Sequence, residues 1–75
     1  MYIMSQDKKT ICSCTKLSAG KNFGGGKTQK YVITGETANN GGIVLGFYEE
    51  EKLAMVELQN VFAAIEEGCK IYAIK

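Results

Sequence analysis

The chain has 75 residues, a formal net charge of +1, three cysteines and neither histidine nor arginine. This length predicts one domain, near the size at which a single hydrophobic core is only marginally stable. No apolar run approaches the ~20 residues that a membrane-spanning helix needs, so a bilayer span is excluded. The odd cysteine count argues against a secreted disulfide scaffold, and the charges after the first apolar run argue against a signal peptide. We therefore expect a reduced, cytoplasmic protein.

Residues 2–5 and 10–15 predict a short N-terminal hairpin, because two β-forming runs flank a polar turn at 6–9. The segment 16–29 follows, with the sequence KLSAGKNFGGGKTQ. Its four glycines and three lysines show no regular period, which is typical of a flexible loop. We expect residues 1–75 to form a single domain that carries this flexible loop.

Residues 30–37 and 43–48 predict a second hairpin, rich in β-branched residues and joined by glycines and asparagines that tolerate positive φ. Residues 69–74 predict a last strand. The expected fold class is α+β, with a small antiparallel sheet of four to five strands. Two N-terminal hairpins and the C-terminal strand would form this sheet, and one helix near residues 49–67 would pack on it.

The predicted helix has acidic residues in its first turn, and Gly68 is placed to end it in a left-handed conformation. Helical periodicity predicts an inward face consisting of Ala54, Leu58, Val61, Phe62 and Ile65. A second stripe on the helix consists of Leu53, Val56, Asn60, Ala63 and Ala64. One sheet cannot cover both faces, so the second stripe predicts the interface of a homo-oligomer or a protein partner.

Gly26, Lys27 and Thr28 are similar to the end of a phosphate-binding loop, but position 21 is a lysine where that motif needs a glycine. Thr28 also leads into a strand instead of a helix, so nucleotide hydrolysis is not expected. A glycine-rich loop with lysines and one phenylalanine can still hold an anionic nucleotide by charge and stacking. The candidate ligand-binding residues are Lys21, Phe23, Lys27, Thr28 and Lys30.

No catalytic or metal site is predicted, and no cofactor. Structural zinc needs four ligands, whereas Cys12, Cys14 and Cys69 provide three and no histidine completes the set. Strand periodicity places Cys12 and Cys14 on one face, where we expect them to act as small hydrophobes. No histidine is available to activate a thiol, so we expect the protein not to be an enzyme.

The charges are unevenly distributed along the chain. Residues 1–35 carry six lysines and one aspartate, whereas residues 36–75 carry three lysines and seven glutamates. This asymmetry can steer an anionic ligand toward one end of the molecule. Nucleic acid is not an expected partner, because lysines without arginine read bases and phosphates poorly.

Four stretches carry a resemblance: the opening Tyr2–Lys9, the strand Leu45–Tyr48 before acidic residues, the helical segment Ala63–Gly68 and the closing Tyr72. Together they resemble a family of small, mostly uncharacterised proteins of Firmicutes and their phages. The resemblance implies a phage or mobile-element inhibitor of host defence, which sequesters a nucleotide-type ligand or binds a defence protein. The alternative is a protein–protein interaction or assembly module without a small-molecule ligand. No functional residue is implied by the resemblance.

Overall fold

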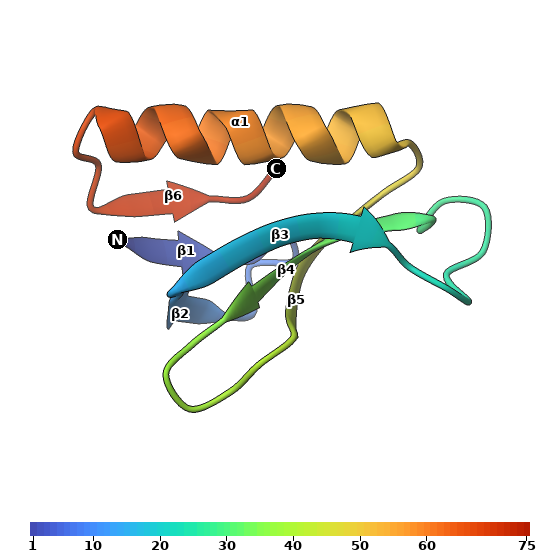
Figure 1. The fold of residues 1–75 in the computed structure, drawn as a ribbon, viewed down its shortest axis with the longest axis horizontal. Coiled ribbons are helices and arrows are strands. Elements are labelled where there is room, and N and C mark those ends of the chain that lie inside the picture. The colour runs from blue at the N-terminus through green and yellow to red at the C-terminus, as the bar shows by residue number, and fades with distance from the viewer.

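The computed structural model describes residues 1–75 and has the predicted α+β fold, with one helix and six strands (Figure 1). The number of strands is close to the predicted four to five, but they form two three-stranded sheets instead of one. The elements are β1 (Tyr2–Met4), β2 (Ile11–Ser13), β3 (Lys16–Lys21), β4 (Tyr31–Glu36), β5 (Ile43–Tyr48), α1 (Glu51–Glu66) and β6 (Ile71–Ala73).

The first sheet has the strand order β2-β1-β6. The predicted N-terminal hairpin is confirmed, with β1 and β2 antiparallel. The C-terminal strand differs from the prediction, because β6 runs parallel to β1. The physical reason is that α1 carries the chain back across the sheets, so that β6 starts at the same end of the molecule as β1 (Figure 1). Hydrogen bonds from Tyr2 N to Lys70 O and from Ile74 N to Met4 O extend this pairing.

The second sheet is antiparallel, with the order β3-β4-β5. It contains the predicted hairpin of β4 and β5, in which the register shifts between Ile33 and Thr34 and leaves Leu45 as the extra residue on β5. Residues 16–21, expected in the flexible loop, form β3 instead. This part of the loop prediction is wrong because Leu17 and Ala19 alternate with Ser18 and Gly20 and can pack against the core along β4. The loop that remains covers residues 22–30.

Gln6 joins the two sheets. Its backbone N–H donates to Leu45 O over 2.7 Å, and its side-chain Oε1 accepts a hydrogen bond from Phe47 N over 3.0 Å. Its Nε2 donates to Phe47 O over 3.2 Å. Gln6, which follows β1 in the chain, therefore takes the place of a neighbouring strand along the outer edge of β5.

The turn after β1 holds Gln6 in this position. Ser5 is buried, donates its hydroxyl to Asp7 Oδ1 over 2.6 Å and accepts a hydrogen bond from Thr10 N. The hydroxyl of Ser5 and the backbone N–H of Lys9 lower the pKa of Asp7, because both donate to its carboxylate. Lys8 has a φ of +64°, which allows the chain to reverse within this turn.

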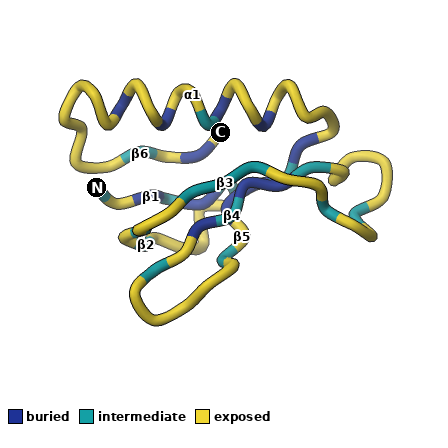
Figure 2. The backbone as a smooth tube through the Cα atoms, viewed as in Figure 1, coloured by how far each residue is buried: buried dark blue, intermediate teal, exposed yellow.

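The hydrophobic core lies between α1 and the two sheets, and Figure 2 shows the buried positions along β4, β5 and the inner side of α1. Its seven residues come from every layer of the fold: Ile3, Ile33, Leu45, Tyr48, Ala54, Val61 and Ile74. Gly35 allows a close approach at one side of this core. A Cβ there would lie 2.7 Å from Cys14 Sγ and 3.0 Å from Leu45 Cδ1.

The helix begins at Glu51 and ends at Glu66, which is slightly shorter than predicted. Its C-terminal signal is confirmed: Gly68 has a φ of +76°. Gly68 N donates to Ile65 O and Cys69 N donates to Ala64 O, both over 3.0 Å. This is the hydrogen-bond pattern of a Schellman motif, which satisfies the last carbonyls of the helix.

The inward face of α1 differs from the prediction. Phe62 and Ile65 were expected inside, but each is 56% exposed. The buried helix residues are Ala54, Glu57, Val61 and Ala64. The helix is rotated because the Glu57 carboxylate is buried and accepts three partly buried hydrogen bonds, described below, so that it occupies the inner face.

We expect Gln6→Ala to lower the free energy of unfolding by about 2 kcal/mol, because two partly buried hydrogen bonds to Phe47 are lost. Denaturant unfolding measures this change. Gln59→Ala is the matched control, since Gln59 is exposed on α1 and its side chain makes no hydrogen bond. A change in Gln59→Ala as large as that in Gln6→Ala would contradict the bridging role of Gln6.

Candidate functional site

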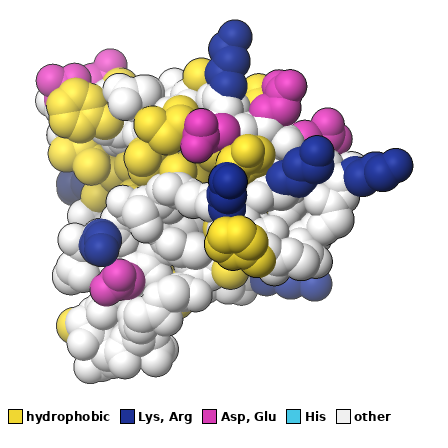
Figure 3. Space-filling view, turned by 45° about the vertical axis from the view of Figure 1, so that its right-hand side comes forward, with side chains coloured by type: hydrophobic (Ala, Val, Ile, Leu, Met, Phe, Trp, Pro, Cys, Tyr) yellow, Lys and Arg dark blue, Asp and Glu magenta, His cyan; other side chains and the backbone are white.

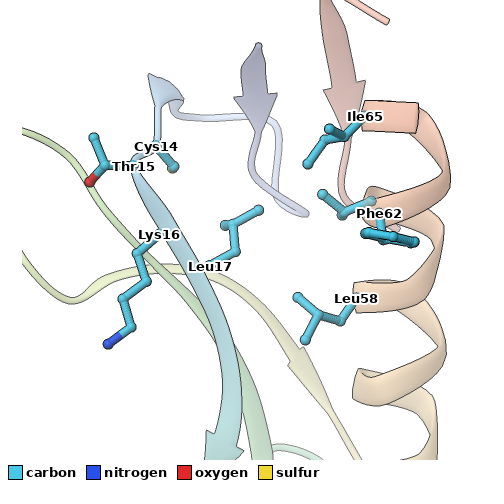
Figure 4. A pocket seen from close by; sticks show the side chains of 8 residues that line it. Cys14, Thr15, Lys16, Leu17, Leu58, Phe62 and Ile65 are labelled. Atoms are coloured by element: carbon cyan, nitrogen blue, oxygen red, sulfur yellow. The ribbon is translucent and has the colours of Figure 1, made fainter. Parts of the chain in front are cut away.

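A groove of about 280 Å³ lies between α1 and the start of β3 (Figure 4). One wall of the groove is the segment that connects β2 to β3, together with the start of β3. The second half of α1 forms the opposite wall. The groove is lined by Cys14, Thr15, Lys16, Leu17, Leu58, Val61, Phe62 and Ile65. Six of these eight residues are hydrophobic, so the groove is suited to apolar side chains.

The apolar surface of the groove is open to solvent. Phe62 and Ile65 lie on its helix wall, and Leu17 extends toward α1 from β3 (Figure 4). Val61 also lines the groove and is itself buried. Figure 3 shows apolar side chains gathered over and below α1, interrupted by acidic and lysine side chains. A recessed apolar surface with a polar rim is typical of an interaction site.

Lys16 and Thr15 form the polar side of the groove. Lys16 Nζ lies 3.7 Å from Glu36 Oε2, but both side chains are largely exposed, so this ion pair contributes little to stability. The hydroxyl of Thr15 donates to Glu36 O over 3.2 Å. The groove therefore has no buried charge, and its recognition chemistry is apolar.

Cys12 and Cys14 lie on the same face of the strand segment, as predicted, with their Sγ atoms 3.0 Å apart. Both are half-buried. Burial raises the pKa of the Cys14 thiol to about 12, with contributions from the hydrogen bond to Cys12 and from its charge. Cys14 is therefore protonated at neutral pH and contributes to the groove wall as a small hydrophobe. Cys69 is exposed, and no group of three or more possible metal ligands forms.

The predicted ligand-binding residues lie together but form no pocket. The five residues are Lys21, Phe23, Lys27, Thr28 and Lys30, and all of them are exposed. Phe23 is 90% exposed. Asn22 closes the base of the loop, because its N–H donates to Lys30 O and its Nδ2 donates to Gln29 O. Neither the groove nor a second cavity of about 40 Å³ beside Gln6 is lined by the five residues.

Four of the five residues of the predicted interface stripe on α1 are exposed to solvent. Leu53, Val56, Asn60 and Ala63 are exposed. Ala64 is buried, so its assignment to the stripe is wrong; its small side chain packs inward one turn after Val61. The side chain of Asn60 is engaged within the chain, because its Nδ2 donates to Glu57 Oε1 over 3.0 Å.

The sequence analysis did not identify the buried polar cluster around Glu57. This residue is only 4% exposed. Its Oε2 accepts hydrogen bonds from the Tyr72 hydroxyl over 2.9 Å and from Lys75 N over 2.8 Å, and its Oε1 accepts one from Asn60. The carboxylate thus ties α1 to β6 and to the residues after it. The spacing contained a signal, because Glu57 lies three residues after Ala54 and four before Val61, in the middle of the inward arc.

Two tyrosines surround this carboxylate. Burial raises the pKa of Tyr72 to about 12, and the hydrogen bond to Glu57 and the charge of Glu57 add to the effect. Burial also raises the pKa of Tyr48 to about 12, followed by the charges of Glu57 and Tyr72. The hydroxyl of Tyr48 is buried without a hydrogen-bond partner. Both phenols stay protonated near neutral pH, so the Tyr72 hydroxyl keeps the proton that it donates to Glu57.

No protein-family model matches the chain, and neither a curated protein nor a solved structure shows significant similarity to it. The helix of the structure is neither long nor apolar enough to cross a membrane. The inference about function therefore depends on the site itself.

The free energy of unfolding is expected to fall as the pH rises from 10 to 12. Tyr48 and Tyr72 have folded-state pKa values above the ordinary 10.0, so the folded protein keeps protons that the unfolded chain loses in this range. The stabilisation is complete below pH 10 and is lost toward pH 12. The raised pKa of Cys14 also makes the free energy of unfolding fall with rising pH, beginning at pH 9, the ordinary pKa of a thiol.

Tyr72→Phe is expected to be less stable than the wild type at pH 8. Between pH 10 and 12, the free energy of unfolding of Tyr72→Phe should fall by about 1 kcal/mol less than that of the wild type. The difference is no larger because solvent screens part of the interaction of this half-buried residue. Urea unfolding at a series of pH values measures both quantities. Curves for the wild type and Tyr72→Phe that run parallel above pH 10 would contradict the assignment.

Proposed function

We propose that this protein is a small, non-enzymatic binding protein whose groove between α1 and β3 holds an apolar segment of another protein. The observation that supports this function best is the exposure of Phe62 and Ile65 on the wall of an apolar cavity. Covering the exposed half of each side chain would contribute roughly 1–2 kcal/mol. Two such side chains provide an anchor for a partner of moderate affinity.

The size of the groove favours a protein segment over a small molecule. Its volume of about 280 Å³ lies just below that of typical ligand pockets, which occupy roughly 300–1,000 Å³. It lacks the converging polar groups that orient a small ligand, because Lys16 is paired with Glu36 at its rim. A few apolar side chains of a partner match both its size and its lining.

The biological setting stays a prediction. The resemblance to small phage and Firmicutes proteins suggests an inhibitor of host defence, and a groove for a protein segment is compatible with binding a defence protein. Self-association through the exposed residues Leu53, Val56, Asn60 and Ala63 is a separate proposal, supported by the apolar area that this flank of α1 leaves uncovered.

Selection from a displayed library of random ten-residue peptides tests the function. We expect the wild type to enrich peptides that contain apolar residues, and Phe62→Asp to lose at least tenfold in affinity for them because a charge then lies in the apolar groove. Val56→Asp is the matched control, since Val56 is 50% exposed on the other flank of α1. The absence of enriched peptides, or equal losses in Phe62→Asp and Val56→Asp, would overturn the proposal.

An anionic nucleotide-type ligand at the loop 22–30 is the second candidate. It is supported by Phe23, Lys27 and Lys30 on the loop that Asn22 closes, with Lys21 at the end of β3 directly before it. Binding of ADP-ribose or a cyclic dinucleotide would raise the melting temperature of the wild type, and replacing the three lysines by glutamine would abolish the rise. An equal rise in both proteins, or no rise in the wild type, would exclude this candidate.

A further inference from the structure

We propose that the segment held in the groove binds as an added β-strand along the free edge of β3. This inference rests on the proposed function and specifies the conformation and chemistry of the partner. It begins from the strand order β3-β4-β5, in which β3 has a neighbour on one side only.

The backbone of β3 provides unpaired hydrogen-bonding groups at this edge. Asn22 N donates to Lys30 O, and the antiparallel register continues from there through Gly20 opposite Val32 and Ser18 opposite Thr34. Antiparallel pairing alternates, so the N–H and C=O groups of Ala19 and Leu17 point away from β4. No hydrogen bond of the structure outside the sheet ladders uses these groups. An extended chain is the partner that satisfies such a row of donors and acceptors.

The other outer edge of this sheet is not open in the same way. Gln6 covers β5 at Leu45 and Phe47 with three hydrogen bonds. In the first sheet, the outer strands β2 and β6 have three residues each, whereas β3 has six. The open edge of β3 is therefore the long one, and natural sheets usually cover such an edge.

The helix already provides a cover for a strand at this position. Leu58, Phe62 and Ile65 line the groove from α1, and α1 runs antiparallel to β3 (Figure 1). Leu58 and Phe62 are separated by about 6 Å along the helix axis. Alternate side chains of a strand are about 6.6 Å apart, so two of them would meet these two helix residues in turn.

The lysines of β3 argue against a second copy of this chain as the partner. Antiparallel pairing of two β3 edges along their full length would bring the Lys16 of one copy close to the Lys21 of the other, and like charges at opposite positions are destabilising. Lys21 makes no ion pair within the chain. The partner is therefore an extended segment of a different protein, with apolar residues at alternate positions and an acidic residue near Lys21.

Amide hydrogen exchange on the complex with a selected, Phe62-dependent peptide tests this inference. We expect the amides of Leu17 and Ala19 to exchange at least tenfold more slowly in the complex, because they become hydrogen-bonded to the peptide. The amides of Ser18 and Gly20 are the internal control, since they already point toward β4. Slower exchange confined to Leu17 and Ala19 supports strand addition.

Peptides with N-methyl groups at alternate positions provide a second measurement. Methylating the set of amides that faces β3 should reduce affinity at least tenfold, whereas methylating the other set should leave it within about threefold.

A peptide that binds without slowing the exchange of Leu17 and Ala19, or that binds as a helix, overturns strand addition and leaves the proposed function intact. The absence of any Phe62-dependent peptide overturns the proposed function itself. A dimer of the free protein with protected Leu17 and Ala19 amides would overturn the choice of a foreign partner.

Discussion

The carboxylate of Glu57 determines how α1 lies on the two sheets. It is buried, and its oxygens accept hydrogen bonds from Tyr72, Asn60 and the backbone of Lys75. A buried carboxylate that lost these donors would cost several kcal/mol, so the helix can adopt only the rotation that keeps Glu57 inside. This rotation turns Phe62 and Ile65 outward. The exposure of the helix wall of the groove thus follows from a polar contact on the inner face of the helix.

The sequence was sufficient to predict the local elements of the fold. Both hairpins, the helix and its glycine C-cap follow from period-two runs, turn residues and an apolar stripe, which are local signals. The direction of β6 and the division into two sheets depend on tertiary connections that no local pattern contains. The strand β3 was missed because its glycine and lysines hide an alternation that is stable only beside β4.

The candidate site was less predictable than the fold. Hydrophobicity alone placed Phe62 on the inner face and excluded Glu57 from it, because periodicity analysis assigns a charged residue to solvent. Its burial becomes favourable only through Tyr72 and Lys75, which are 15 and 18 positions away in the chain. The composition of the glycine–lysine loop predicted a site for an anionic ligand, but in the structure this loop is an exposed turn closed by Asn22.

The attachment of Gln6 to β5 has a consequence for aggregation. Gln6 hydrogen-bonds to Leu45 and Phe47 along the outer edge of β5, so these backbone groups are not free to pair with a strand of another molecule. Uncovered sheet edges are the usual starting points of edge-to-edge association between copies of a protein. The turn after β1 therefore protects one edge of the second sheet against aggregation while it connects the two sheets.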